Sequence, residues 1–327
     1  MLACIALASV VMFIVSPPAR LSTTRTGEPE IAELLRKHAG WGHNNLSAFI
    51  LVDGRVRYGG LGSDQATEFE IASVTKTFNG ELLDQAVERG DVAYTTTVAD
   101  IIGERAVDSE LADVTLEELA THTAGLPRLG KTKLRNAVAM VIGANPYVGE
   151  DTDYVMDQAL RAKLTDRGTE NYSNLGHAVL GHLLAENAQL AYPELLQRDI
   201  LTPLEMHSTY VALPGTVGPE APRGVWASGR SVEAWEQEGY APAGALRSTP
   251  EDMAKYAQAI VDKHDPNAVW VKEDNGTFWH NGASFGFTND LIIDPASGTA
   301  VYVAGDTGSR VNYLAEDLLK AVQEGGL

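Results

Sequence analysis

The sequence FEIASVTKTF occupies residues 69–78, and it decides how the chain folds around its first candidate site. Residues 68–72 are strand-like, and a 3.6-residue periodicity follows them, which predicts a helix that begins near Ser73. Residues three apart share one helix face, so the Lys76 amine should lie beside the Ser73 hydroxyl. A neutral Lys76 could accept the Ser73 proton, and the helix N-terminus would favour the developing negative charge. Taken alone, the pattern is also typical of a capping serine on a surface helix.

A second candidate motif is YSN at residues 172–174, directly before another predicted helix. A tyrosine close to Ser73 could relay the serine proton to a leaving group. The Asn174 amide could hold both a substrate carbonyl and Lys76. By itself, a polar triplet before a helix more often caps that helix than binds a substrate.

A third candidate motif, HNGA at residues 280–283, precedes a strand-like segment that begins at Phe287. Glycine at a strand edge would let a substrate approach the backbone closely. The N–H group of Ala283 could then join that of Ser73 in an oxyanion hole. The alternative is an ordinary loop at a strand boundary.

Strand signals gather near the two ends of the chain, whereas the middle is mostly helical. Strands are predicted at 46–52, 55–58, 287–293 and 299–304, and helices at 116–122, 153–163, 175–186, 250–261 and 310–323. This order predicts an α+β fold (an α/β sandwich). Both chain ends should build one antiparallel sheet that helices flank, with an all-α insertion beside it.

The N-terminal segment differs in composition from the rest of the chain. Residues 2–15 are apolar apart from one serine, and two prolines end this run. A helix of that length reaches about 21 Å, short of the roughly 30 Å hydrocarbon core of a bilayer. Residues 1–16 are therefore predicted to be a signal peptide or an N-terminal membrane anchor, with a buried core helix as the alternative. The chain is accordingly expected to be exported, and either secreted or held at the outer face of the membrane.

The rest of the chain is expected to form a polar linker and one folded domain. The linker is predicted at 17–30 and the domain at 31–327. Within the domain, 31–80 and 241–327 should form the sheet part and 81–240 the helical part.

Composition excludes several classes of function. The chain has 327 residues, with 25 Lys+Arg against 44 Asp+Glu and a formal net charge of −19 at pH 7. Such acidity excludes nucleic acid as a partner and disfavours adsorption of the folded body to anionic lipid. The single cysteine, Cys4, excludes a disulfide framework and a cysteine-based zinc site. His177 and His182 are expected to be surface or core residues; no metal site and no cofactor are expected.

Together, the three motifs resemble those of the serine β-lactamase and penicillin-binding family. The similarity is strongest to the branch of class C β-lactamases, D-alanyl-D-alanine carboxypeptidases and related esterases. It covers nearly everything from Leu34 to Val322. It includes the longer stretches FEIASVTKTF (69–78), THTAGLP (121–127), PLEM (203–206) and PAGALRSTPED (242–252).

The resemblance implies a role for each motif residue. It implies that Ser73 is the acyl-accepting nucleophile, Lys76 its proton partner and Tyr172 the general base and acid. The implied substrate-binding residues are Asn174, His280, Asn281 and Gly282, and the implied oxyanion hole is formed by Ser73 and Ala283. His122 lies in the resembling stretch at 121–127 and is expected to be structural.

The third motif departs from the strong β-lactamases, which carry Lys-Thr-Gly where this chain carries His280-Asn281-Gly282. Neutral histidine supplies a hydrogen bond but no fixed charge, and a pKa near 6.5 would let mild acid charge it. Arg310, at the start of the last predicted helix, could replace the missing charge but is expected to be exposed to solvent.

The predicted function is an exported serine hydrolase that forms an acyl-enzyme on Ser73. Its substrate is expected to be a small molecule or a peptidoglycan peptide, cleaved at a β-lactam or D-alanyl-D-alanine bond. One alternative is a promiscuous carboxylesterase or D-aminopeptidase of the same fold. A second alternative is a non-catalytic penicillin-binding sensor domain, which would acylate and then stop.

Overall fold

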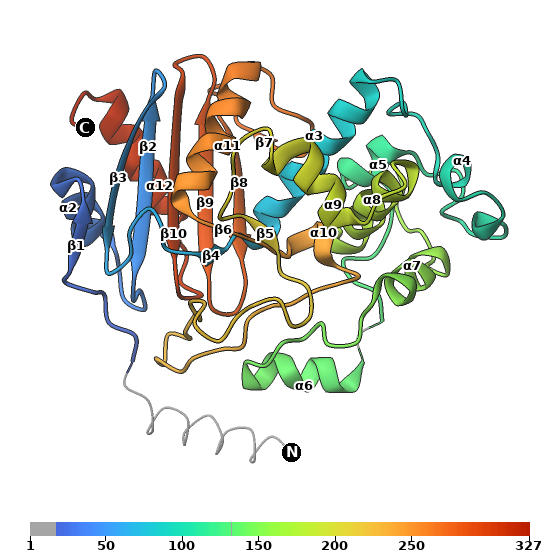
Figure 1. The fold of residues 1–327 in the computed structure, drawn as a ribbon, viewed down its shortest axis with the longest axis horizontal. Coiled ribbons are helices and arrows are strands. Elements are labelled where there is room, and N and C mark those ends of the chain that lie inside the picture. Colours follow the sequence, from blue (N-terminus) through green and yellow to red (C-terminus); the bar gives the residue numbers. More distant parts are fainter. Residues whose placement is uncertain (1–17, 132) are drawn as a thin grey trace.

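A computed structural model describes residues 18–131 and 133–327, in which one large sheet lies beside a helical part (Figure 1). The strand order is β1-β3-β2-β10-β9-β8-β7, and every neighbouring pair is antiparallel. The strands are β1 (Arg25–Gly27), β2 (Leu46–Val52), β3 (Arg55–Leu61), β7 (Val271–Lys272), β8 (Phe278–Ala283), β9 (Thr288–Asp294) and β10 (Thr299–Gly305). The expected antiparallel sheet from both chain ends is therefore confirmed.

The centre of the sheet joins strands from opposite ends of the sequence. β2 pairs with β10 along its whole length, from Leu46 opposite Gly305 to Val52 opposite Thr299. The β2–β3 hairpin turns at Asp53 and Gly54, whose φ angles are +48° and +75°. Positive φ at both positions is the geometry for which Asp-Gly is favoured in a two-residue hairpin.

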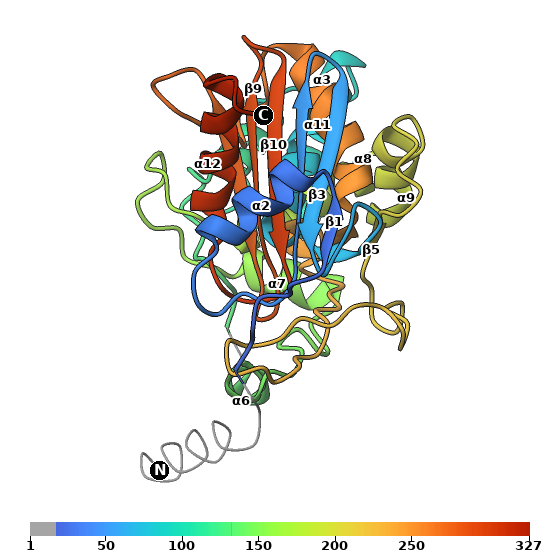
Figure 2. The same ribbon diagram turned by 90° about the vertical axis from the view of Figure 1, so that its left-hand side faces the viewer.

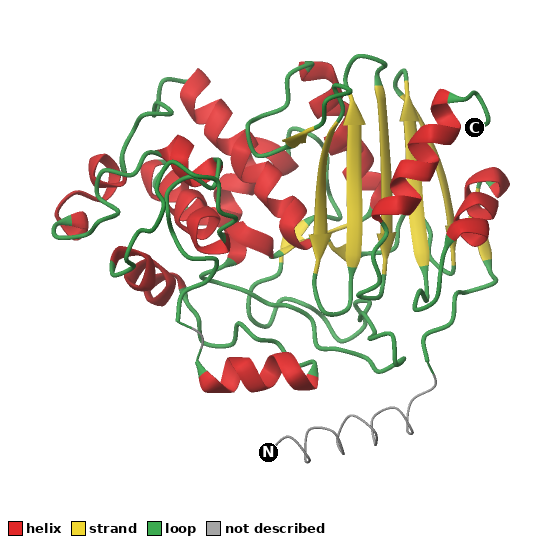
Figure 3. Ribbon diagram, turned by 180° about the vertical axis from the view of Figure 1, so that it is seen from behind, coloured by secondary structure: helices red, strands yellow, loops and turns green. Residues whose placement is uncertain are grey.

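Helices cover both faces of the sheet (Figures 2 and 3). α2 (Pro29–His38) and α12 (Asn312–Gln323) pack on one face, and α11 (Pro250–Lys263) packs on the other. Side chains alternate along each strand, so two separate apolar layers form. Ile50 and Val301 belong to the layer beneath α2 and α12, whereas Phe49 and Tyr302 belong to the larger core shared with the helical part.

The helical part is built around a central pair, α3 (Thr75–Glu88) and α8 (Asn174–Asn187). α8 is apolar on nearly all sides, which is typical of a helix that others surround. The surrounding helices are α4 (Val98–Ile102), α5 (Leu116–Ala120), α7 (Thr152–Leu160), α9 (Tyr192–Leu196) and α10 (Ala241–Gly244), whereas α6 (Leu134–Ile142) lies apart from them (Figure 1).

The insertion expected to be all-α also contains a strand and a long irregular stretch. β5 (Tyr210–Val211) lies inside it, and a small sheet of order β4-β6-β5 joins this strand to β4 (Phe69–Glu70) and β6 (Leu246–Ser248). The described stretch 212–240 contains no helix. Its side chains instead pack beside the site described below.

The predicted linker is partly wrong, because residues 25–30 belong to the fold. β1 pairs with β3 through backbone groups, which requires no apolar side chains, and Pro29 begins α2 at a position where proline is favoured. The predicted signal peptide or anchor at 1–16 lies outside the described residues. Within 18–131 and 133–327, none of the helices has both the length and the apolar character to cross a membrane.

A buried arginine holds the small sheet together. Arg247 on β6 is 0% exposed; it donates to Glu68 and, over 3.0 Å, to Glu70 on β4. It also donates to the carbonyl oxygen of Pro222 at 2.8 Å. The Glu70 carboxylate accepts the backbone N–H of Trp235 at 2.9 Å. Burial raises the pKa of Glu70, and the Arg247 charge opposes that shift.

We expect Arg247→Met to lower the free energy of unfolding by about 3–5 kcal/mol, because it leaves a buried carboxylate without its cation. The double variant Arg247→Met/Glu70→Gln should recover part of that loss. Arg161→Met, which breaks an exposed pair with Asp157, serves as the control and should have almost no effect. Urea denaturation measures the free energy of unfolding of the three variants and of wild type. Equal stability of Arg247→Met and wild type would show that the Arg247–Glu70 pair does not stabilise the fold.

Candidate active site

Ser73 lies at the junction between the small sheet and the central helix pair. β4 ends at Glu70, a 3₁₀ turn spans Ala72–Val74, and α3 begins at Thr75, so the predicted helix start is right to within two residues. Ala72 has a φ of +45°, which is the left-handed region that a residue with a Cβ rarely adopts. Such strain is typical of functional sites, where the surrounding structure enforces it.

Lys76 lies in the first turn of α3 and is 0% exposed. Its Nζ is 3.2 Å from Ser73 Oγ and donates to the carbonyl oxygen of Ala243, on α10, at 2.6 Å. Burial lowers the pKa of Lys76, because a charged ammonium loses its hydration there. A lysine so placed can take a proton from the serine hydroxyl.

Tyr172 reaches Ser73 from the loop that precedes α8. Its hydroxyl donates to Ser73 Oγ over 2.8 Å, and its ring centroid is 4.9 Å from Lys76 Nζ. The guanidinium carbon of Arg128 lies 4.9 Å from the same centroid. Burial acts to raise the pKa of Tyr172, but Lys76, the Ser73 hydrogen bond and Arg128 together lower it. At a given pH, a larger fraction of Tyr172 is therefore phenolate, the form that can accept a proton, than in an isolated tyrosine.

His122 holds the loop that carries Tyr172. Its ring lies 4.5 Å from the Tyr172 ring, and its Nδ1 accepts the backbone N–H of Ser173 at 3.1 Å. Burial lowers the pKa of His122 to about 3, so the neutral ring keeps this nitrogen free to accept. Ser173 in turn caps α8 by accepting the N–H of Gly176 at 2.9 Å. His122 therefore acts as a structural residue here.

Asn174, the first residue of α8, lies in the same cavity as Ser73. Its backbone N–H donates to the carbonyl oxygen of Arg128 at 3.0 Å. Its Oδ1 is buried and makes no hydrogen bond within the described residues. An acceptor of this kind can hold a donor that a bound molecule brings.

Two further histidines on α8 bond to the backbone instead of to Ser73. His177 is fully buried, with Nε2 3.1 Å from the carbonyl oxygen of Ala120, and His182 Nε2 is 2.8 Å from that of Gly239. Both contacts are those of structural core residues. Within 18–131 and 133–327, His, Cys, Asp and Glu side chains form no group of three that could hold a metal ion.

His280 lies within β8, not in a loop before a strand, and only 5% of it is exposed. Its Nδ1 is 2.9 Å from the carbonyl oxygen of Asn281, so Nδ1 carries the proton and Nε2 remains an acceptor. Burial and the Lys76 charge lower the pKa of His280 to about 4. The expectation that mild acid near pH 6.5 charges this residue is therefore wrong.

The edge of β8 presents backbone groups toward Ser73. Ser284 N–H bonds to the Phe287 carbonyl, so the next pair along the ladder, Ala283 with Thr288, is of the non-hydrogen-bonded type. The Ala283 N–H therefore points away from β9 and out of the sheet edge. Asn281 has the same orientation, so its N–H lies at this edge, whereas its side chain lies on the sheet face opposite to that of His280. The predicted Asn281 contact with substrate is thus geometrically available only to its backbone.

Gly282 lets β8 pack against the segment that leads to Ser73. A Cβ at this position would collide with the carbonyl oxygen of Ile71 and would lie 2.8 Å from Asn289 Nδ2. From the sequence, Gly282 was predicted to let a substrate approach the backbone. The structure gives a different reason, which is the close approach of two backbone segments.

A cavity of about 170 Å³ contains Ser73, Asn174 and Ala283. Its remaining lining residues are Ala72, Arg128, Leu129, Met140, Tyr147, Trp235, Gln237, Tyr240, Ala243 and Gly244. Arg310, which the sequence offered as a replacement charge, is exposed and does not line this cavity. Arg128 directly follows the resembling stretch at 121–127 but was not among the predicted site residues, and neither were Tyr147, Trp235 and Tyr240.

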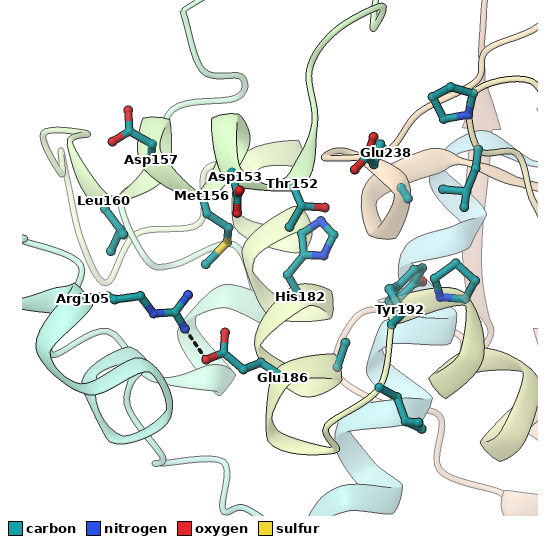
Figure 4. Close-up of a pocket in the computed structure, with 17 residues that line it drawn as sticks. Arg105, Thr152, Asp153, Met156, Asp157, Leu160, His182, Glu186, Tyr192 and Glu238 are labelled. Atoms are coloured by element: carbon teal, nitrogen blue, oxygen red, sulfur yellow. Dashed lines mark hydrogen bonds and ion pairs between the residues drawn. The ribbon is translucent and has the colours of Figure 1, made fainter.

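A larger cavity, of about 820 Å³, lies among α7, α8 and α9 (Figure 4). Arg105 and Glu186 form an ion pair at its wall, and His182 and Tyr192 also line it. Ser73 does not line this cavity, and no serine is among its lining residues. Size alone therefore does not identify the site of the serine chemistry.

We expect Gly282→Ala to lower the rate of Ser73 labelling by a fluorophosphonate more than tenfold. The added methyl group would move β8, and with it the Ala283 N–H, away from Ser73, and a shift of about 1 Å can lower a rate about a hundredfold. Gly218→Ala is the matched control, since a Cβ there meets nothing within 4 Å. Equal labelling of Gly282→Ala and wild type would show that the Ile71 contact does not position the site.

The β-lactamase family model matches residues 32–317. The chain is 29% identical over 210 residues to β-lactamase-like 1 of Homo sapiens, which covers 61% of this chain and 40% of that protein. It is 27% identical over 194 residues to the D-alanyl-D-alanine-carboxypeptidase/endopeptidase AmpH of Escherichia coli (strain K12), covering 58% and 48%. The chain thus spans less than half the length of either relative.

A solved structure shows the same fold. The β-lactamase/D-alanine carboxypeptidase from Pseudomonas syringae superposes with a TM-score of 0.74 at 16% identity, over 90% of this chain and 96% of that chain. The fold and the family model agree with each other. The chain belongs to the β-lactamase family.

Proposed function

We propose that the chain is a serine hydrolase that transfers an acyl group first to Ser73 Oγ and then to water. The observation that carries this proposal is the pair of contacts on one oxygen atom. Lys76 Nζ lies 3.2 Å from Ser73 Oγ, and Tyr172 donates to it over 2.8 Å. Two groups with lowered pKa values therefore flank a hydroxyl that is a weak nucleophile on its own.

In the acylation step, Ser73 Oγ attacks the substrate carbonyl carbon and its proton passes to Tyr172 or Lys76. The N–H groups of Ser73 and Ala283 stabilise the negative charge that forms on the carbonyl oxygen. The bond to the leaving group then breaks, and Tyr172 returns the proton to that group. In the second step, water attacks the carbonyl carbon of the acyl ester, and Tyr172 or Lys76 accepts the water proton. The ester bond to Ser73 then breaks, the acid product leaves, and that proton passes to Ser73 Oγ.

The substrate class we propose is a β-lactam or a D-alanyl-D-alanine peptide. Support comes from the relatives named as β-lactamase/D-alanine carboxypeptidase and D-alanyl-D-alanine-carboxypeptidase. An exported location belongs to the same proposal and rests on the apolar residues 2–15. Peptidoglycan peptides lie outside the cytoplasm, so the two parts of the proposal agree.

A second candidate function is that of a carboxylesterase or D-aminopeptidase of the same fold. The observation that favours it is His280, which is neutral at pH 7 and offers an acceptor at Nε2. β8 therefore lacks a fixed charge for a substrate carboxylate. A third candidate, the non-catalytic sensor, requires the acyl-enzyme to persist; turnover of an acylating substrate distinguishes it from the hydrolases.

Ser73→Ala should abolish both turnover and covalent labelling by a fluorescent penicillin or a fluorophosphonate. Lys76→Ala and Tyr172→Phe should each lower the acylation rate about a hundredfold or more, because each takes part in proton transfer. The double variant should lose much less than the sum of the two, since these residues act as a unit. Ser297→Ala, in the exposed β9–β10 turn, is the control and should label normally. Labelling that persists in Ser73→Ala would place the chemistry elsewhere.

His280→Lys should shift selectivity from neutral esters toward carboxylate-bearing β-lactams. A partly exposed charge pair contributes about 0–1 kcal/mol and a desolvated one a few, so the ratio of kcat/KM values should change between a few-fold and about a hundredfold. The measurement compares p-nitrophenyl butyrate with nitrocefin for wild type and variant.

In the wild type, the same ratio should stay flat between pH 5.5 and 7.5. The pKa of His280 is lowered to about 4, so the ring remains neutral throughout this range. A ratio that rises toward the anionic substrate as the pH falls through 6.5 would show that His280 titrates as an exposed histidine does.

A further inference from the structure

Arg128 brings a fixed positive charge to the cavity that contains Ser73. Among the described residues that line this cavity, it is the one with a charged side chain. Its guanidinium carbon lies 4.9 Å from the centroid of the Tyr172 ring. No carboxylate forms an ion pair with it within 18–131 and 133–327, although the chain has 44 acidic residues. Arg167 and Arg247, by contrast, both bind glutamates.

The backbone fixes Arg128 relative to the reacting groups. Its carbonyl oxygen accepts the N–H groups of Asn174 at 3.0 Å and of Leu175 at 3.3 Å. The preceding residue, Pro127, accepts the Ser173 hydroxyl at 2.7 Å. Arg128 therefore keeps a constant position beside the Tyr172–Asn174 loop, while its exposed side chain remains free to bind a ligand.

Three aromatic side chains, those of Tyr147, Trp235 and Tyr240, line the same cavity. The Tyr147 ring lies 5.3 Å from that of Trp235 and 5.6 Å from that of Tyr240. Tyr240 is held in place by the N–H of Gly130, which donates to its hydroxyl at 2.7 Å. These rings offer a short apolar segment of a bound molecule a surface in the cavity that Arg128 also lines.

We propose that Arg128 determines specificity by binding a carboxylate of the substrate, while the Tyr147–Trp235–Tyr240 wall holds a short apolar segment. This inference rests on the proposed function and names the substrate class of that site. Guanidinium binds carboxylate through two parallel hydrogen bonds, which a histidine acceptor on β8 cannot provide. The substrate's charge is thus recognised from the helical part of the molecule and not from β8.

Arg128 also acts on Tyr172, because its charge helps to lower the pKa of that phenol. Its substitution should therefore slow the hydrolysis of neutral substrates as well. A loss of activity alone would not show recognition of a carboxylate. The informative quantity is the ratio of kcat/KM for an anionic substrate to that for its neutral isostere.

Two matched ester pairs measure this ratio. Mono-p-nitrophenyl succinate and p-nitrophenyl butyrate differ by a carboxylate in the acyl half. 3-Butyryloxybenzoate and phenyl butyrate differ by a carboxylate in the leaving half. The variants are Arg128→Gln and Arg128→Lys, with Arg310→Gln as the control that removes an exposed charge outside the cavity.

Arg128→Gln should lower the anionic-to-neutral ratio about five- to fiftyfold in one of the two pairs, and that pair identifies the half of the substrate that carries the charge. Arg128→Lys should retain part of the preference, because it keeps the charge but loses the paired hydrogen bonds. Arg310→Gln should leave both ratios unchanged. High salt should weaken the wild-type preference.

An Arg128→Gln ratio equal to wild type in both pairs overturns the proposal, and so does an equal fall in Arg310→Gln. If the chain forms an acyl-enzyme but does not hydrolyse it, the rate of the initial burst of p-nitrophenol or phenol release measures acylation. The anionic-to-neutral ratio is then taken from these burst rates. If no ester reacts and Ser73 is not labelled by a fluorophosphonate, the proposed function fails, which is a result distinct from unchanged selectivity. The esters of a pair differ in intrinsic reactivity, above all because the succinate carboxylate attacks its own ester, so the rate without protein is measured for each ester and subtracted, and each variant is compared with wild type on the same pair.

Discussion

The bond between Lys76 Nζ and the carbonyl oxygen of Ala243 is the constraint on which the rest of the site depends. It joins α3 to α10 over 2.6 Å inside the protein, where a buried amine needs a partner. With the amine fixed there, Ser73 Oγ lies within its reach at 3.2 Å and Tyr172 can approach from the other side. The short α10 therefore sets the geometry of a reaction in which none of its own side chains takes part.

Much of this arrangement follows from local patterns in the sequence. The spacing of Ser73 and Lys76 on one turn predicts their contact, because the geometry of a helix fixes it. The strands at 46–52 and 299–304 were predictable from alternation and turn residues, which act over only a few positions. The approach of Tyr172 to Ser73 came from the resemblance, since nothing local to either residue encodes a distance between them.

The features that could not be predicted depend on contacts between segments that lie far apart in the chain. Such contacts leave no periodic pattern in the sequence. The Ile71 carbonyl explains Gly282, yet the two residues are far apart in the chain and share no pattern. The low pKa of His280 comes from burial beside Lys76, which no property of the residue itself discloses. Residues 25–30 were assigned to a linker because edge strands pair through their backbone and need no apolar signature. Each of these errors concerns the environment of a residue and not its type.

The pairing of β2 with β10 has a consequence for the order in which the protein can form. These strands lie about 250 residues apart, so the ribosome must release nearly the whole chain before the central ladder can close. The α3–α8 region can collapse earlier, since its contacts are nearer in sequence. Until the last strands emerge, β1, β3 and β2 form only a small three-stranded sheet in which the backbone groups along the edge of β2 lack a partner. A chain shortened before Thr299 would lack the partner for β2 and would expose an apolar edge that promotes aggregation.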